Sequence, residues 1–322
     1  MKSSLLRAAL SACLALGAAG AAAQPYPARP IEVVVCYGAG GGTDLTIRLV
    51  EGQVSKLLGQ KIVVTNRPGA GGALAMNQFI RSPSDGYTFA LAGTATLTVV
   101  PHAEAAAVQY KPGDYAPVAQ LSSVSNFLVV PADSALKSFR DLVDFAKKNP
   151  PGRVKAAITS TGSMLHLPFV QIEKLYGVKF TFIPHKSSAP VVTAVMGGHV
   201  DVGAADMAAA AAQVRAGSVR ALGVFSAQRL QSMPNVPTLK EQGADIESGF
   251  YNVLLAPRGT PEPIIATVRE AFRKVLADPE VIERGLKADI PLEYQDDRTM
   301  RTRIDRDYET YGALLKELGL AR

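Results

Sequence analysis

Apolar residues along the chain form two kinds of pattern, short runs and longer stretches with helical spacing. Residues 31–36 form a largely apolar run, which is typical of a strand buried on both faces of a parallel sheet. From Ile47 to Leu57, apolar residues recur three and four positions apart. They predict an amphipathic helix that Gly59 ends as a left-handed cap. Glycines at residues 38 and 40–42 separate the two patterns, so the predicted order is strand, glycine-rich loop and helix.

The same alternation of strand and helix continues through most of the sequence and predicts two α/β units. Each unit should hold a mainly parallel sheet flanked by helices, because strands that alternate with helices form parallel sheets. Between the units, residues 116–130 predict two strands in close succession, and two charged amphipathic helices are expected at the C-terminus. Further strands are expected at residues 62–65, 87–91, 154–158, 179–183, 200–204, 221–225 and 253–256.

Two loops of small residues follow predicted strands, at positions where α/β proteins bind ligands. Ligands of open α/β sheets lie beyond the carboxyl ends of the strands. The first loop is Gly38-Ala39-Gly40-Gly41-Gly42-Thr43, and the second is Thr159-Ser160-Thr161-Gly162-Ser163. Two such edges that face each other would form a cleft.

Three interpretations of the glycine loop compete. A Walker A loop requires a lysine, and no lysine lies between Glu32 and Lys56. A dinucleotide fingerprint requires a third glycine and an acid after the second strand, where the sequence has Thr43 and Asn66. A nest of backbone amides at a helix N-terminus needs only glycines, and it binds an anion such as a carboxylate. We favour this nest over a simple tight turn, and expect Asp44 to cap the helix or lie in its first turn.

Support for catalytic or metal-binding arrangements is weak. Ser163 and His166 lie three residues apart, but the G-x-S-x-G motif is absent and no nearby acid is placed to orient the histidine. Ser163 is better explained as a helix cap. The four histidines show no zinc-ligand spacing, and His166 and His185 are candidate ligand contacts or hydrogen-bonded loop residues. We therefore predict no catalytic residue, metal or cofactor.

The first residues have the composition of a secretory signal peptide. Lys2 and Arg7 precede an apolar segment at residues 8–22 that is too short to span a bilayer. Small residues before Gln24 predict cleavage there, near Ala23, and export to the periplasm. A lipoprotein box ending at Cys13 is disfavoured, because the apolar run continues beyond this cysteine.

Composition narrows the class of partner. The 322 residues are 48% hydrophobic and 19% charged, which is typical of a globular protein. Cleavage of the signal peptide would lower the formal net charge from +6 to +4, the basic residues are scattered, and no tryptophan occurs. No nucleic-acid partner is therefore expected. Cys36 would be the one cysteine left, which excludes an intrachain disulfide and predicts a buried thiol.

Several short motifs along the chain are weak alone, whereas their order and spacing are specific. They are Tyr26-Pro27-Ala28-Arg29-Pro30-Ile31, Gly40-Gly41-Gly42-Thr43-Asp44, Asn66-Arg67-Pro68-Gly69-Ala70-Gly71-Gly72, Pro83-Ser84-Asp85-Gly86-Tyr87-Thr88, Pro184-His185-Lys186, Ala189-Pro190, Gly197-Gly198-His199-Val200-Asp201, Pro234-Asn235-Val236-Pro237-Thr238 and Ala256-Pro257-Arg258-Gly259-Thr260-Pro261. With these motifs, the sequence after residue 23 resembles, over nearly its whole length, the periplasmic solute receptors of the tripartite tricarboxylate transporter systems, the Bug-type receptors.

The resemblance implies a periplasmic-binding-protein-like architecture, in which two domains joined by a two-strand hinge close on a ligand in the cleft between them. With residues 1–23 as signal peptide, domain 1 would comprise residues 24–122 and 229–322, and domain 2 residues 123–228. Backbone amides and small hydroxyl groups from both domains would hold a carboxylate. With His166 included, the expected contacts are Gly40, Gly41, Gly42, Thr43, Thr94, Thr96, Ser160, Thr161, Gly162, Ser163, His166, His185, Ser187 and Asp206.

The expected function is that of a non-enzymatic periplasmic receptor. It would capture a small organic acid as a monomer and dock transiently to integral-membrane transporter subunits. A sensory adaptor would bind its ligand by the same closure of two domains, so it is one alternative. An exported serine hydrolase is the other. The sequence departs from the family pattern at residues 36–39, 94–96, 185–189 and 250–252, near the expected pocket. The identity of the acid therefore cannot be inherited from a relative.

Overall fold

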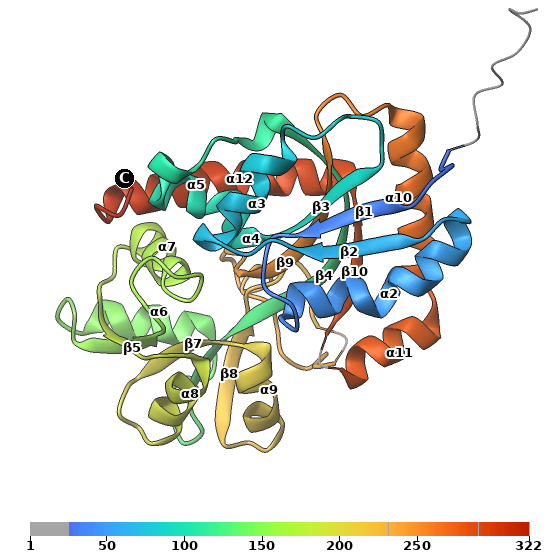
Figure 1. Ribbon diagram of the computed structural model, residues 1–322. Coiled ribbons are helices and arrows are strands. Elements are labelled where there is room, and N and C mark those ends of the chain that lie inside the picture. The colour runs from blue at the N-terminus through green and yellow to red at the C-terminus, as the bar shows by residue number, and fades with distance from the viewer. Residues whose placement is uncertain (1–25, 231, 289, 322) are drawn as a thin grey trace, which may run out of the picture.

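The computed structural model describes residues 26–230, 232–288 and 290–321, and the predicted signal peptide lies outside them. The chain forms two lobes joined by extended segments (Figure 1). This arrangement confirms the predicted α/β class, with helices on both faces of each sheet.

Lobe 1 is built on sheet A. Its parallel strands are β1 (Ile31–Val35), β2 (Ile62–Asn66) and β3 (Thr88–Gly93), in the order β2-β1-β3. β9 (Gly249–Pro257) runs antiparallel to β3. The first part of β4 (Tyr115–Pro131) then pairs antiparallel with β9 and with β10 (Leu292–Asp296).

Lobe 2 is built on sheet B. β5 (Val154–Ile158) lies between β6 (Phe180–Pro184) and β7 (Val202–Asp206), and all three are parallel. The last part of β4 pairs antiparallel with β7 and with β8 (Val219–Val224). Each sheet thus combines a parallel core with antiparallel strands near the junction of the lobes.

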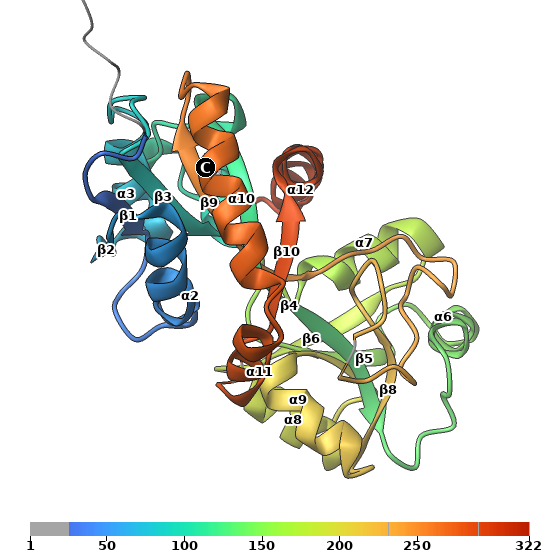
Figure 2. The same ribbon diagram turned by 90° about the vertical axis from the view of Figure 1, so that its right-hand side faces the viewer.

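The long strand β4 connects the two sheets (Figure 2). Its residue Ser125 pairs with Gly249 of β9 in sheet A, and the next residue, Asn126, pairs with Asp206 of β7 in sheet B. Two strands were expected at residues 116–130, but the structure has one, because no glycine interrupts the run and its polar middle marks the crossing. We call residues 122–126 and 248–252 the hinge strands.

The return of the chain to lobe 1 occurs later than the sequence indicated. Leu239, Ala244 and Ile246 pack in the hydrophobic core of lobe 2 with Phe225. The backbone N–H of Ser248 also donates to the carbonyl of Phe225. We therefore propose that domain 2 extends to about residue 248 rather than to 228.

Helices cover both faces of sheet A. Alternate residues of β1 pack on opposite faces, with Val33 and Val35 toward α2 and α10, and Val34 toward α3 and α12. The helices of lobe 1 are α2 (Gly42–Leu58), α3 (Ala73–Phe79), α4 (Thr94–Thr98), α5 (Val100–Ala103), α10 (Glu262–Leu276), α11 (Pro279–Lys287) and α12 (Asp297–Glu317), with short 3₁₀ turns at Ala70–Gly72, Ala105–Ala107 and Pro112–Asp114.

Sheet B is covered in the same way. One core contains apolar residues of α6 and α7, and the other contains those of α8 and α9. The helices of lobe 2 are α6 (Phe139–Lys148), α7 (Leu167–Tyr176), α8 (Ser188–Met196) and α9 (Met207–Arg215).

The largest difference from the sequence prediction lies at the C-terminus. Two helices were expected after residue 257, whereas the structure has three, with β10 between the last two. β10 adds a strand beside β4, and α12 then packs Met300 and Ile304 against the second face of sheet A. Because α12 has many charged residues, its few buried apolar residues are difficult to recognise in the sequence.

Candidate functional site

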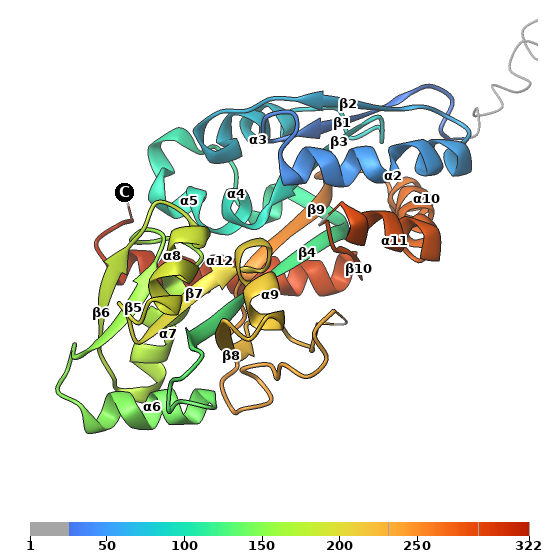
Figure 3. The ribbon, with the colours of Figure 1, turned by 90° about the horizontal axis from the view of Figure 1, so that it is seen from below.

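The carboxyl ends of the parallel strands in both lobes lead to the hinge strands. Gly93, the last residue of β3, pairs with Asn252 of β9, which pairs with Ser122 of β4. In lobe 2, Asp206 ends β7 and pairs with Asn126. Because the loops that follow these strands begin at this place, loops of both lobes border the hinge (Figure 3). This is where an α/β protein binds its ligand.

The glycine loop forms the start of α2. Gly41 is the N-cap residue with extended backbone and no side-chain cap, and Gly40, Gly41 and Gly42 are exposed. The first N–H groups of a helix have no partner within it. They point outward at the positive end of the helix dipole, which favours an anion there. Gly40 has φ +78°, a left-handed backbone that favours glycine.

The buried side chain of Asp44 stabilises the glycine loop. Asp44 lies in the first turn of α2, as predicted, and its side chain is buried. Its carboxylate accepts hydrogen bonds from the Gly40 N–H at 2.8 Å, from Arg48 Nε at 2.9 Å and from Asn66 Nδ2 at 2.9 Å. Burial alone would raise the pKa of Asp44, but these hydrogen bonds together lower it. Asp44 therefore stays charged and paired.

Thr94 and Thr96 are both buried, and their hydroxyl groups are engaged within the protein. Thr94 Oγ1 accepts from the backbone N–H of Tyr251 at 2.8 Å. Thr96 Oγ1 donates to the carbonyl of Gly71 at 2.7 Å and lies 2.5 Å from Tyr37 Oη. In this arrangement the two hydroxyls hold α4 in place, and their expected ligand contacts stay predictions.

The loop of lobe 2 is longer than the sequence indicated. Ser160 and Thr161 are exposed, whereas Ser163 Oγ accepts from Thr159 Oγ1 at 3.1 Å. The expected role of Ser163 as a helix cap is wrong, because α7 begins four residues later, at Leu167. Residues 160–166 form turns of their own, closed by backbone bonds such as Ser163 N–H to Ser160 O.

His166 supports this loop from the interior. Its ring is buried and lies edge-on to Phe182, with ring centroids 4.4 Å apart. Its Nδ1 accepts from the backbone N–H of Gly162 at 3.0 Å. Burial lowers the pKa of His166, and nearby Glu173 opposes this effect. Among the described residues, no hydrogen bond joins the His166 ring to the Ser163 hydroxyl, so the two side chains do not form the dyad of a serine hydrolase.

The remaining candidates surround the N-termini of α8 and α9. Ser187 is the exposed N-cap residue of α8, and the Asp206 carboxylate caps α9 by accepting from the Ala209 N–H at 3.0 Å. The ring of His185 lines a surface cavity of about 520 Å³ along α8, together with Ala189, Pro190, Thr193, Ala194 and His199. Within residues 26–230, 232–288 and 290–321, no hydrogen bond links lobe-1 candidates to those of lobe 2.

Comparison with known proteins identifies the family. Residues 46–320 match the model of the tripartite tricarboxylate transporter family receptor, TctC. The chain is 35% identical over 320 residues to the UPF0065 protein in the gbd 5'region of Cupriavidus necator, with 98% of this chain and 96% of that protein covered. The chain belongs to the TctC receptor family. It is also 32% identical to BugT of Bordetella pertussis, over 83% of this chain and 82% of that protein.

Solved structures of TctC receptors share the fold. A ligand-free TctC solute-binding protein from Polaromonas superposes with a TM-score of 0.84 at 30% identity, over 91% of this chain and 99% of that one. An R. palustris protein with adipate gives 0.65 at 26% identity, covering 92% and 99%. MatC from Rhodopseudomonas palustris with bound malate gives 0.61 at 26% identity, covering 90% and 100%. The fold is therefore that of periplasmic binding proteins, and this family consists of receptors rather than enzymes.

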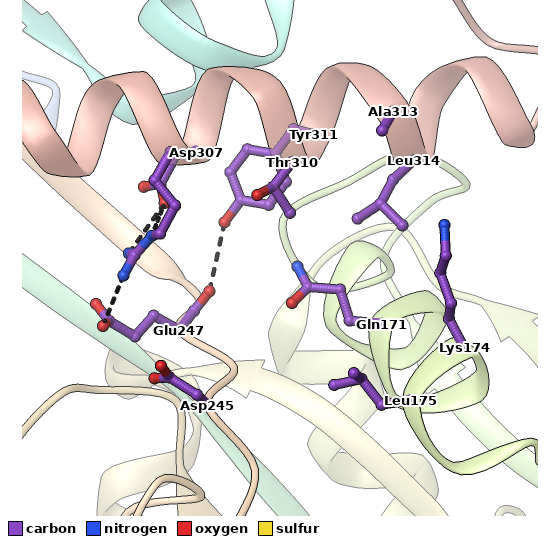
Figure 4. A pocket seen from close by; sticks show the side chains of 11 residues that line it. Gln171, Lys174, Leu175, Asp245, Glu247, Asp307, Thr310, Tyr311, Ala313 and Leu314 are labelled. Carbon is purple, nitrogen blue, oxygen red and sulfur yellow. Dashed lines mark hydrogen bonds and ion pairs between the residues drawn. The ribbon is translucent and has the colours of Figure 1, made fainter.

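A cavity of about 330 Å³ lies between the lobes, lined by α7, α12 and the linker before β9, and by none of the predicted site residues. Arg306 donates to the carboxylates of Asp307 and Glu247. Tyr311 Oη donates to the Glu247 carbonyl at 3.4 Å (Figure 4). Tyr311 also packs with apolar residues of α7. This side of the receptor thus holds an ion-paired contact between the lobes.

In the part of the chain that the structure describes, no three side chains of His, Cys, Asp or Glu converge to hold a metal ion. None of the helices in this part combines the length and apolar character that crossing a membrane requires.

Sequence reasoning missed the polar residues of the hinge strands. Ser122, Asn126, Ser248 and Asn252 lie close to the predicted loops and hydrogen-bond to them or to each other. They occupy a run of Ser and Asn in an otherwise apolar strand and the start of β9. Ser and Asn residues within otherwise apolar predicted strands could have indicated that these strands border a ligand site.

Proposed function

We propose that this TctC receptor captures a small carboxylate between its lobes and delivers it to an uptake system of the tripartite tricarboxylate type. The start of α2 carries the proposal. It offers the backbone amides of the exposed Gly42 and the half-exposed Thr43, which have no partner among the described residues, at the positive end of a 17-residue helix.

The chemistry at the start of α2 suits release of the carboxylate as well as its capture. Neutral amides bind an anion without the strong, fixed ion pair that an arginine fork would supply. Arg48, the arginine one turn further along the same helix, is engaged with Asp44. A cargo protein must release its ligand, so a backbone-only contact in lobe 1 that lobe 2 completes on closure fits the task.

Closure on the ligand is part of the proposal. By whole-chain superposition, this structure is more similar to the ligand-free Polaromonas receptor than to the adipate- and malate-bound proteins. We propose that it has the ligand-free arrangement. Rotation about the hinge strands would bring residues 160–163 and the starts of α8 and α9 toward α2.

Localisation and partners complete the proposal. The signal peptide over residues 1–23 would direct the chain to the periplasm, where it would act as a monomer. Loaded receptor would dock transiently to integral-membrane subunits of the transporter, which receive the carboxylate.

Calorimetric unfolding with a panel of acids tests the proposal. The panel should contain mono-, di- and tricarboxylates, with malate and adipate included, and ATP as a competing class. A carboxylate at a hundred times its Kd should stabilise the protein by about 2.7 kcal/mol. Small-angle scattering should then show a smaller radius of gyration with that acid. Stabilisation by ATP and by no carboxylate would contradict the proposal.

Gly41→Val tests the position of the site. Gly41 has φ −77°, and a Cβ there would only touch the Gly38 carbonyl oxygen at 3.4 Å, so the fold should be kept. The valine side chain should cover the amides and abolish carboxylate binding. Gly52→Ala, in the same helix with open space around it, is the matched control and should bind as the wild type does. Unchanged affinity in Gly41→Val would show that the loop is only a turn.

A further inference from the structure

A network of neutral side chains joins the start of α2 to both hinge strands. Thr43 Oγ1 donates to Asn252 Oδ1 at 2.7 Å, and Asn252 Nδ2 donates to Ser122 Oγ at 2.9 Å. Ser122 Oγ lies 3.2 Å from Thr46 Oγ1, which donates to the Gly42 carbonyl at 2.7 Å. The network therefore begins and ends in the first turn of α2 and passes through β9 and β4.

The direction of each hydrogen bond in the network is determined. Asn252 can only donate through Nδ2 and accept through Oδ1. Because the Thr46 proton is directed to the Gly42 carbonyl, the Ser122 hydroxyl must donate to Thr46 Oγ1. Ser122 and Thr46 are buried, so a broken bond would leave a polar group without water. The network therefore keeps the start of α2 in one position relative to β4 and β9.

Asn252 also contacts the backbone before α4. A Cβ on Gly93, the residue before α4, would lie 3.4 Å from Asn252 Oδ1 and 3.0 Å from Tyr37 Oη. The Asn252 amide therefore packs against the backbone that leads into α4. Asn252 thus contacts both Thr43 of the glycine loop and the residue that precedes α4.

The position of Asn252 relates these loops to lobe movement. It lies three residues after Gly249, where β9 pairs with the crossing point of β4. Ser122 lies at the same level on β4 and pairs with Asn252 in register. A rotation of the lobes about the hinge strands would therefore act directly on the side chains that hold the start of α2.

We propose that Asn252 is a positioning residue for ligand binding, which fixes the amides at the start of α2 relative to the two hinge strands. The inference rests on the proposed function for its ligand, a carboxylate, but the positioning itself is a property of the ligand-free protein. Asn252 acts through Thr43 and Ser122 and need not touch the ligand.

Amide hydrogen exchange of the ligand-free protein tests the positioning directly. Asn252→Leu keeps the size of the side chain and removes both hydrogen bonds. Exchange at residues 45–47, whose amides are the first with helical hydrogen bonds, should therefore rise tenfold or more while β1 stays protected. Thr267→Val, which removes an exposed helix hydroxyl bonded to the Pro263 carbonyl, is the control and should change neither region. Unchanged exchange at residues 45–47 in Asn252→Leu would overturn the inference.

Two further variants separate positioning from ligand chemistry. Ser122→Ala keeps the bond from Thr43 to Asn252 and removes the link to β4; it should raise exchange by a smaller factor and serves if Asn252→Leu does not fold. Asn252→Asp keeps an acceptor for Thr43, but it can accept from Ser122 only if that hydroxyl no longer donates to Thr46, so exchange should rise no more than in Ser122→Ala. Exchange as fast as in Asn252→Leu would contradict the inference.

Titration with malate and adipate completes the test. Asn252→Leu should weaken the Kd of whichever acid binds about tenfold, because the amides are no longer held in place. Asn252→Asp should weaken it at least as much, because its charge repels an anion at the start of α2. Wild-type affinity in Asn252→Asp would place the anion elsewhere and defeat the proposed site, whereas the exchange data would still decide the positioning role.

Discussion

His166 accepts, through its buried Nδ1, a hydrogen bond of 3.0 Å from the backbone N–H of Gly162. The acceptor exists only while this nitrogen carries no proton. Burial lowers the pKa of His166 below its usual value, so the folded protein keeps the neutral ring. The exposed loop at residues 160–161 therefore depends on a buried, uncharged histidine.

Stability should decrease as the pH falls from about 7 toward about 5. The unfolded chain protonates His166 near its ordinary pKa, whereas the folded chain resists protonation, so the unfolded state binds more protons in this range. In His166→Asn, the side-chain oxygen can replace Nδ1 as acceptor and does not titrate, so this part of the pH dependence should disappear. Chemical denaturation at several pH values measures it, and an unchanged slope in His166→Asn would assign the dependence to other groups.

Gly162→Ala should destabilise the protein by more than the backbone alone requires. Gly162 has φ +78°, which costs an alanine about 1–2 kcal/mol. A Cβ there would also lie 2.8 Å from Leu320 Cδ1, after the end of α12. Thermal unfolding should therefore show a larger loss than in Gly177→Ala, which has φ +67° and open space around the Cβ position.

Leu320→Ala provides the second half of this test. In the Gly162→Ala background it should recover the excess loss, since the contact at 2.8 Å is removed. Additive effects of the two changes would mean that the loop of lobe 2 and the C-terminal segment do not press on each other in solution.

Asp44→Ala should cost about 2–3 kcal/mol at neutral pH, because a buried carboxylate that accepts three hydrogen bonds is lost. The pKa of Asp44 is lowered on folding, so its contribution is present above the unfolded pKa of about 3.9 and is lost as the pH falls further. Denaturant titration of both proteins should show the difference shrinking below about pH 4. Glu283→Ala breaks an exposed helix pair with Lys287 and should cost less than about 0.5 kcal/mol.

Cys36 should resist thiol reagents in the folded protein. Its side chain is fully buried, and burial raises the pKa of the thiol to about 12. In a chain that begins at Gln24, alkylation should be slow without denaturant and fast above the unfolding midpoint, because the thiolate is the reactive form. Rapid labelling of the native protein would show that sheet A opens near the start of the glycine loop.

The sequence patterns predicted the two α/β units well because their strands and helices each bury a continuous apolar face. The strands at residues 31–36 and 154–158 and the helix that ends at Gly59 lie where expected. The position of the glycine loop before α2 was predictable because it depends only on consecutive residues of the sequence.

What the sequence could not show depends on contacts between distant segments. Thr43 and Asn252 are 209 positions apart, and only the pairing of β9 between β3 and β4 brings them together. The role of His166 as a buried acceptor likewise depends on packing against Phe182 from another strand. The proposed extension of lobe 2 to residue 248 rests on the packing of residues 239–246, which form no regular strand or helix that a sequence pattern could predict.

The position of β9 also has a consequence for synthesis of the chain. Sheet A needs β9 between β3 and β4, and β9 starts at Gly249, after all the strands of lobe 2. As the chain leaves the ribosome from its N-terminus, β1, β2 and β3 therefore emerge long before the strand that completes their sheet. Sheet B has all its strands by Val224 and can form first. The inserted lobe is then the early folding unit, and the lobe that carries the glycine loop is the late one.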